Sequence, residues 1–230
     1  MNLITAIFHS TLGKKYLMAI TGLLLILFVI GHMLGNLQIF LGQETINAYG
    51  AMIKSKPALL WGARSGLLLV IAIHIWSAIT LTKRNNGARP VGYRVNRAVA
   101  ASYASRTMIW SGLILLAFII YHILHFTVGA LDPTLLKLKD DSGRHDIYQM
   151  IISGFSQPLV SGFYILSMAL LCMHLSHGTS SLFQSLGFRS GRQKVWADWL
   201  ALVLAWGIFV GNSSIPLAIL MGYGKEVLKQ

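Results

Sequence analysis

Six histidines lie inside long apolar stretches of this chain of 230 residues. They are His32, His74, His122, His125, His174 and His177. A histidine surrounded by hydrocarbon is energetically costly unless it is paired or binds a ligand, so each one marks a candidate functional site. Imidazole nitrogens ligate transition metals and also carry protons. The sequence therefore indicates metal binding or proton transfer inside a membrane.

The apolar stretches are long enough to cross a bilayer as helices, which takes about 20 residues at about 1.5 Å per residue. Five stretches meet this requirement: Tyr16–Leu37, Leu59–Thr82, Thr107–Gly129, Pro158–Phe183 and Trp196–Met221. Only Arg64 and Asp198 are charged within them, and both lie near an end. We therefore expect an all-α, multi-pass membrane protein with five transmembrane helices in a single domain over residues 1–230.

The composition agrees with a membrane protein. Apolar residues make up 55% of the chain and charged residues 11%, with a mean hydropathy of +0.63, whereas a soluble domain carries roughly 25% charged residues. The single cysteine, Cys172, excludes a disulfide framework, a CxxC redox pair and the attachment motif of a c-type haem. The net charge of +12 does not indicate nucleic acid, because basic residues in a membrane protein first report its topology.

The basic residues are distributed unevenly between the two ends of the expected helices. The N-terminal segment and the second and fourth loops carry 11 Lys and Arg residues, and the one acid on this side is Asp198 near the start of the fifth stretch. The opposite side carries 8 Lys and Arg residues and 6 acids. Loops rich in Lys and Arg remain in the cytoplasm. We therefore expect the N-terminus in the cytoplasm and the C-terminus outside.

Two of the connecting segments differ in their expected structure. Segment Leu41–Pro57 carries apolar residues at helical spacing, which predicts a short interfacial helix. These residues are Ile46, Tyr49 and Ile53. Segment Ala130–Gln157 is nearly neutral and is expected to be a loop.

On this topology the histidines fall at two depths. The first and third helices carry theirs in the outer half of the membrane: His32, His122 and His125. The second and fourth helices carry theirs in the inner half: His74, His174 and His177. The rise of a helix separates the two levels by roughly 10–15 Å. His9 and His145 lie outside the apolar stretches and are expected at the surface.

Pairs of imidazoles on facing helices are the ligands of b-type haem in helical bundles. Two imidazoles leave no open position on the iron, which suits electron transfer. We therefore expect the first four helices to form a bundle that holds two b haems, one in each leaflet. We also expect the second ring nitrogen of each ligand to meet a backbone carbonyl or a hydroxyl.

The spacing leaves open which member of each i, i+3 pair is the ligand, because both members share a helix face. The pairs are His122 with His125 and His174 with His177. The other member is expected to meet a haem propionate, a water molecule or a loop.

Two other classes of protein remain open on the residues alone. A transporter or proton channel would use the histidines as a relay, and would show broken helices or acids at mid-membrane. Gly211, Asn212 and Pro216 are expected to interrupt the fifth helix only a little. The other class is a di-haem cytochrome b of a hydrogenase or formate dehydrogenase, which commonly places two ligands on one helix or has another number of helices.

Four short motifs give the chain a resemblance to a known family. They are Ile30-Gly31-His32-Met33, Leu81-Thr82-Lys83-Arg84-Asn85-Asn86, Ile120-Tyr121-His122, and Met173-His174-Leu175-Ser176-His177-Gly178 leading to Phe183. With their spacing, they resemble the five-helix, di-haem cytochrome b subunit of succinate:quinone oxidoreductases, which are the succinate dehydrogenases and fumarate reductases. The resemblance covers nearly the whole chain.

The resemblance implies which histidines are haem ligands and what the chain does. The implied ligands are His32 with His122 for the outer haem and His74 with His174 for the inner one. The implied protein anchors a flavoprotein subunit and an iron–sulfur subunit on the cytoplasmic face of a bacterial cytoplasmic membrane. Succinate and fumarate would react on those partners. This chain would pass electrons between the iron–sulfur clusters and a quinone, with menaquinone expected, as part of respiratory complex II of the tricarboxylic acid cycle.

Further residues are candidates for contacts with the haem propionates. Arg106, at the inner end of the third helix, is expected to serve the inner haem, and Arg64 of the second helix the outer one. His177, Ser180 and Ser181 are further candidates. Each arginine has an alternative role in which it reaches out to the lipid headgroups.

A quinone site needs a group that gives or accepts protons near the carbonyl oxygens. Glu44 is the only acid in the first outer loop. If it serves the quinone, Glu44→Gln should abolish quinone-linked turnover while both haem spectra remain.

Overall fold

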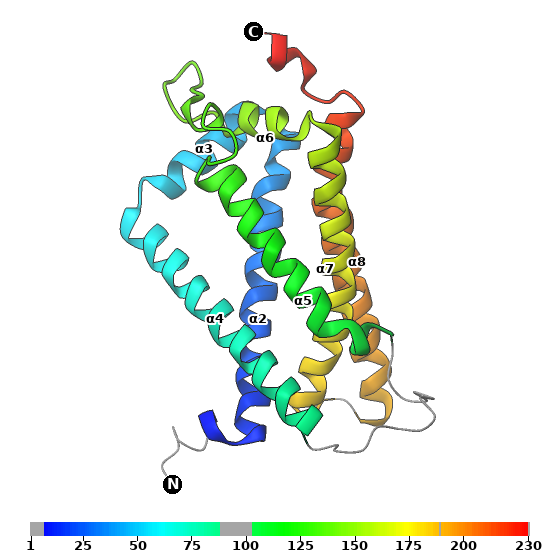
Figure 1. Cartoon of the computed structure of the whole chain (residues 1–230). Coiled ribbons are helices and arrows are strands. Elements are labelled where there is room, and N and C mark those ends of the chain that lie inside the picture. Colours follow the sequence, from blue (N-terminus) through cyan, green and yellow to red (C-terminus); the bar gives the residue numbers. More distant parts are fainter. Residues whose placement is uncertain (1–6, 88–102, 189, 230) are drawn as a thin grey trace. The chain divides into compact units, whose positions relative to one another are not determined.

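The computed structural model describes residues 7–87, 103–188 and 190–229, and it leaves the side chains of 103–107 and 229 undescribed. Five long helices account for most of the described chain (Figure 1). They are α2 (Thr11–Leu37), α4 (Pro57–Gly87), α5 (Tyr103–His122), α7 (Pro158–Ser185) and α8 (Gly191–Leu220). All five are long and apolar enough to cross a membrane, which confirms the predicted number for the described part of the chain.

The helix boundaries follow local chemistry. α4 and α7 begin at Pro57 and Pro158, because proline fits the first turn of a helix, where its missing N–H is not needed. α5 does not stop at its last α-helical residue but continues as a π-helical turn over Ile123–Thr127. α8 runs unbroken through Pro216 to Leu220, so the expected slight interruption there is wrong.

The helices contribute to two compact units, and each long helix has residues in both. Unit 1 consists of Met1–Phe28, Arg64–Gly112 and Met173–Ala205. Unit 2 consists of Val29–Ala63, Leu113–Cys172 and Trp206–Gln230. His74 and His174 belong to unit 1, whereas His32 and His122 belong to unit 2. Each implied ligand pair therefore lies within one unit.

Unit 2 contains two short helices that pack against each other (Figure 1). α3 (Gln43–Lys54) confirms the helix predicted in the first outer connection. α6 (Ile147–Phe155) was not predicted, since the whole segment Ala130–Gln157 was expected to be a loop. Its apolar side chains form much of the unit's buried core, with Ile152 completely buried.

Asp146 fixes the start of α6. Its carboxylate accepts a hydrogen bond from the backbone N–H of Gln149, which is the usual N-cap geometry. The same carboxylate accepts hydrogen bonds from Asn47 of α3 at 3.0 Å and from Gln43 at 2.7 Å. Asp146 is 2% exposed, and these bonds satisfy a carboxylate that would be costly to bury alone.

The C-terminal segment of unit 2 turns back after α8. Gly222 and Gly224 take positive φ angles of 115° and 71°, which glycine adopts without strain. Between them, the hydroxyl of Tyr223 donates to the carbonyl oxygen of Ile39 at 2.8 Å. The segment ends in a 3₁₀ helix over Lys225–Lys229, so it is held on unit 2 through side chains as well as through the turn.

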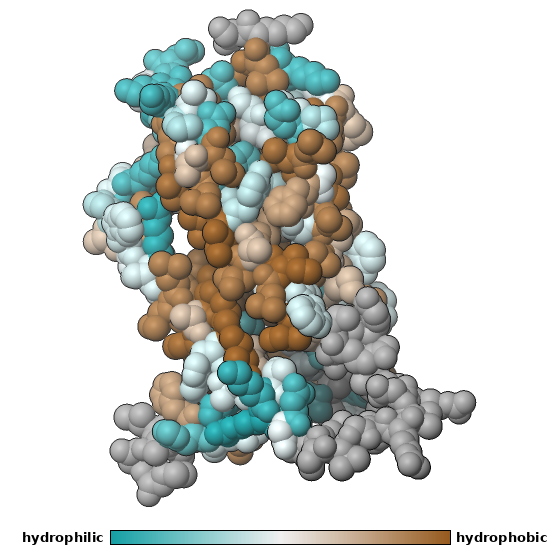
Figure 2. Space-filling model, in the orientation of Figure 1, coloured by the Kyte–Doolittle hydropathy of each residue, from teal (hydrophilic) through white to brown (hydrophobic). Residues whose placement is uncertain are grey.

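The surfaces of the long helices carry many exposed apolar side chains (Figure 2). Examples on α4, α5, α7 and α8 are Leu68, Leu69, Trp110, Leu166, Val210 and Trp206. Water-soluble proteins rarely expose continuous apolar surface of this kind. The described helices are therefore suited to a lipid bilayer environment.

Candidate functional site

His32 of α2 and His122 of α5 face each other in unit 2. Their ring centroids are 5.7 Å apart and their ring planes are at 84°. Metal–imidazole bonds are about 2 Å long, which puts the ring centres of two opposite ligands roughly 6 Å apart. The donor set and its spacing therefore fit one metal ion held between the two rings.

The ring of His122 is oriented by two neighbours. Its Nδ1 lies 3.4 Å from the hydroxyl oxygen of Tyr164 on α7. Phe118, one turn earlier on α5, stacks on it with a centroid distance of 6.0 Å and an angle of 29°. A polar partner on Nδ1 leaves Nε2 as the nitrogen available for a metal.

His74 of α4 has a corresponding hydroxyl partner in unit 1. Thr21 Oγ1 of α2 lies 3.0 Å from His74 Nδ1. Because Thr21 donates its own hydrogen to the carbonyl oxygen of Leu17 at 2.6 Å, its hydroxyl oxygen acts as the acceptor toward the ring. An imidazole that donates to this oxygen from Nδ1 keeps a free lone pair on Nε2.

His174 of α7 repeats this arrangement on another helix. Ser111 Oγ of α5 lies 3.1 Å from His174 Nδ1 and donates its hydrogen to the carbonyl oxygen of Met108 at 3.0 Å. The Ser111 oxygen thus accepts from the imidazole, and Nε2 of His174 is also left as a free donor atom.

The two histidines His74 and His174 both belong to unit 1. Each also lies near a glycine on a neighbouring helix. A Cβ added at Gly22 would lie 3.5 Å from His74 Cε1, and one at Gly112 would lie 3.6 Å from His174 Cε1. Both distances are ordinary van der Waals separations, so a small side chain would also fit between the rings and the α2 and α5 backbones.

The neighbouring histidines of the two i, i+3 pairs have other partners. His125 is buried, and its Nδ1 lies 3.1 Å from the hydroxyl of Tyr164, a partner that was not predicted. The π-helical turn around His125 also changes the helical geometry on which the expected shared face rested. His177 Nε2 lies 3.2 Å from Ser181 Oγ, one turn further along α7.

The other predicted contact residues are placed as follows. Arg64 is half-buried in α4 of unit 1. Arg106 lies in the first turn of α5, where side chains are outside the described structure. Ser180 is buried and donates a hydrogen bond to the carboxylate of Asp198 on α8.

The two histidines predicted at the surface differ from each other. His9 is exposed. His145 is half-buried, with Nδ1 3.2 Å from the carbonyl oxygen of Leu138. Burial, together with the charge of Lys54, lowers the pKa of His145 below its ordinary value.

Glu44 is held in an ion pair. Both of its carboxylate oxygens accept hydrogen bonds from Arg144, which also donates to Asp140 at 2.8 Å. The hydrogen bond from Arg144 lowers the pKa of Glu44. A lowered pKa makes the carboxylate a weaker base and takes it further from the neutral range in which acid–base catalysis is efficient, which weighs against Glu44 as the acid–base group of a quinone site.

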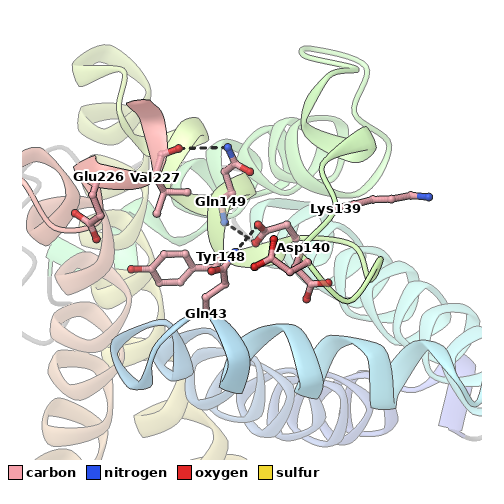
Figure 3. Close-up of a pocket in the computed structure, with 9 residues that line it drawn as sticks. Gln43, Lys139, Asp140, Tyr148, Gln149, Glu226 and Val227 are labelled. Atoms are coloured by element: carbon pink, nitrogen blue, oxygen red, sulfur yellow. Dashed lines mark hydrogen bonds between the residues drawn. The ribbon is translucent and has the colours of Figure 1, made fainter. Parts of the chain in front are cut away.

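A pocket of about 330 Å³ opens beside the start of α6 (Figure 3). Its lining is mostly polar: Gln43, Lys139, Asp140, Asp141, Asp146, Tyr148, Gln149, Glu226 and Val227. Gln149 crosses it to donate to the carbonyl oxygen of Val227, and the side chain of Lys139 extends away from the acids (Figure 3). A quinone ring needs a largely apolar site, so this pocket does not suit one.

The hydroxyl partners of the histidines were not identified from the sequence. Thr21 is separated from His74 by 53 positions, and Ser111 from His174 by 63. Pairs so far apart in the sequence leave no pattern among neighbouring residues that would predict them.

Comparisons of the chain with models of protein families, with curated proteins and with solved structures find no match.

Proposed function

We propose that this chain is the membrane-anchor cytochrome b subunit of a succinate dehydrogenase or fumarate reductase, and that it carries two b haems. The observation that carries the proposal is the close pair of rings of His32 and His122 in unit 2. His74 and His174 both belong to unit 1, and each has a hydroxyl group at its Nδ1. The resemblance of the motifs around these residues to the five-helix cytochrome b subunits supports the same function.

The chain's own residues have defined tasks in this proposal. His32 and His122 would hold one haem, and His74 and His174 the other. When bound, haem b supplies a centre that takes up and releases one electron. The hydroxyls at Nδ1 of His74, His122 and His174 keep the Nε2 atoms of these three rings available for the iron, and the apolar helices exclude water from the ligands.

The proposed orientation follows the basic loops. The N-terminus would be cytoplasmic and the C-terminus outside, in the cytoplasmic membrane of a bacterium. The flavoprotein and iron–sulfur partners would dock on the cytoplasmic side. Electrons would pass between their clusters and a quinone in the membrane, menaquinone being the expected one. Arg64, Arg106, His177 and Ser181 remain the proposed contacts of the haem propionates.

Haem stoichiometry and ligand variants test the proposal. The complex is purified from membranes, and haem b is quantified per chain together with the dithionite-reduced visible spectrum. Two haems per chain are expected. His122→Ala and His74→Ala should each remove one haem and leave the other. The matched control is His9→Ala, because His9 is exposed, and it should keep both.

The same preparation separates the alternative functions. A colourless complex would contradict the proposal and favour a histidine relay in a transporter. Two haems without a flavin-containing partner would instead favour the cytochrome of another membrane oxidoreductase. Reduction of the haems by succinate, carried out by a co-purified flavoprotein, is the outcome that the proposal requires.

A further inference from the structure

His125, the buried histidine that neither ligand pair uses, lies inside an aromatic cluster of unit 2. It is 5% exposed. Its ring centroid is 4.0 Å from that of Phe126, 5.7 Å from that of Tyr121 and 5.9 Å from that of Tyr164. A polar ring in such a place needs a hydrogen-bond partner, because an unpaired buried imidazole would be costly.

Two backbone features hold His125 in this cluster. The chain forms a π-helical turn over Ile123–Thr127, and such turns are rare and frequent at functional sites. Gly154 of α6 brings its backbone against the same rings. A Cβ at position 154 would lie 3.3 Å from His125 Cε1 and 2.7 Å from Phe126 Cε1. The position of His125 is thus imposed from two elements.

The hydroxyl of Tyr164 lies between two imidazoles. Its oxygen is 3.1 Å from Nδ1 of His125 and 3.4 Å from Nδ1 of His122. Tyr164 is itself 6% exposed. A phenol has one hydrogen to donate, so it donates to one ring and accepts from the other.

The direction of these bonds follows if His122 ligates a metal through Nε2. Its proton must then reside on Nδ1, and Nδ1–H donates to the Tyr164 oxygen. The Tyr164 hydroxyl in turn donates to Nδ1 of His125. The reverse order would place a proton on Nε2 of His122 and prevent ligation.

We propose that Tyr164 and His125 form a positioning pair that fixes the orientation and the protonated nitrogen of His122. The inference rests on the proposed function, since it needs His122 to be a haem ligand. The pair acts on the centre held by His32 and His122. The other centre has its own hydroxyl partners, Thr21 and Ser111, and serves as an internal reference.

The Tyr164 oxygen accepts the hydrogen bond from Nδ1 of His122. Without this acceptor the His122 imidazole is a weaker base, and a weaker base as ligand favours the reduced form of the metal. In Tyr164→Phe, the midpoint potential of the His32–His122 centre should therefore rise, while that of the His74–His174 centre stays unchanged. The phenyl ring keeps the aromatic contacts of residue 164. His125→Leu should shift the same potential in the same direction. In His125→Asn the amide oxygen can occupy the position of Nδ1, so the midpoint potential should return part of the way to the wild-type value.

The experiment is a redox titration of the purified complex with both haems resolved, combined with haem quantification. Tyr121→Phe is the matched control, because its ring centroid lies 5.9 Å from that of Tyr164. Among the described residues, no hydrogen bond joins the Tyr121 hydroxyl to either histidine. Tyr121→Phe should leave both potentials unchanged.

Distinct results would overturn the two proposals. Wild-type complex without haem overturns the proposed function. Two haems in the wild type, with both potentials unchanged in Tyr164→Phe, overturn the positioning pair and leave the proposed function standing. Equal shifts in Tyr164→Phe and Tyr121→Phe would show a general packing effect, and would also overturn the pair.

Discussion

Thr21 and Ser111 have the same role on different helices. Each donates its hydrogen to a carbonyl oxygen of its own helix and presents its oxygen to a histidine. Serine and threonine in helices commonly donate a hydrogen bond to the backbone carbonyl oxygen about one turn earlier. Here it has a chemical consequence, because it leaves the hydroxyl as an acceptor and so decides which ring nitrogen carries the proton.

Thr21→Val removes this acceptor while nearly keeping the shape of the side chain. Under the proposed function, the affinity of the His74–His174 site for haem should fall by roughly 10–100-fold, the usual effect of losing a partner of a metal ligand. Haem titration into the purified protein measures it. Thr80→Val is the control, since Thr80 is also bonded within its helix, to the Trp76 carbonyl oxygen. An unchanged affinity in Thr21→Val would contradict the role of Thr21.

The ion pair of Glu44 and Arg144 predicts a pH dependence of stability. The pKa of Glu44 lies below its ordinary value of 4.5, chiefly because of the hydrogen bond from Arg144. A lowered pKa contributes stability above the ordinary value, and this stability is lost as the pH falls through the lowered pKa. Thermal unfolding in detergent should show the loss below about pH 4.5. In Glu44→Gln the unfolding temperature should change less with pH over this range. An identical pH profile in the variant and the wild type would contradict the role of the ion pair.

At the scale of elements, α3 and α6 are joined through one buried side chain. Asn47 is 0% exposed. Its oxygen accepts from the N–H groups of Ile147 and Tyr148, at 2.9 and 3.1 Å, while its nitrogen donates to Asp140 and Asp146. These bonds satisfy backbone donors that every helix leaves unpaired in its first turn. α6 therefore begins where α3 supplies its partners.

Asn47→Ala should destabilise this pair of helices. It leaves the buried N–H of Tyr148 without its partner and removes one donor from the Asp146 carboxylate, whereas the Ile147 N–H keeps its bond to the carbonyl oxygen of His145. The loss costs about 1–3 kcal/mol of unfolding free energy. Hydrogen exchange in the first turn of α6 should increase at the same time. Asn85→Ala is the control, because Asn85 is exposed on α4. Unchanged exchange at Ile147 and Tyr148 would contradict the assigned role.

For the whole molecule, apolar length predicted the five long helices, because a bilayer-spanning helix is a property of consecutive residues. α6 was missed although Asp146 and Gln149 have the spacing of a helix N-terminus. Its apolar residues were too few to span a membrane, and Asn47, the partner of Asp146, is 99 positions away. The π-helical turn at His125 was also missed, and the residues next to His125 there, Gly154 of α6 and Tyr164 of α7, are distant from it in the sequence.

The orientation of the whole chain yields the last prediction, because charge and helix number together determine which loops face the cytoplasm. In a background with Cys172→Ala, single cysteines replace three exposed serines: Ser55, Ser142 and Ser190. Under the proposed topology, a membrane-impermeant thiol reagent labels Ser55→Cys and Ser142→Cys in intact cells. It labels Ser190→Cys only after the membrane is permeabilised. The unsubstituted background controls for other thiols. The opposite pattern would place the basic loops outside and remove the cytoplasmic docking face that the proposed partners require.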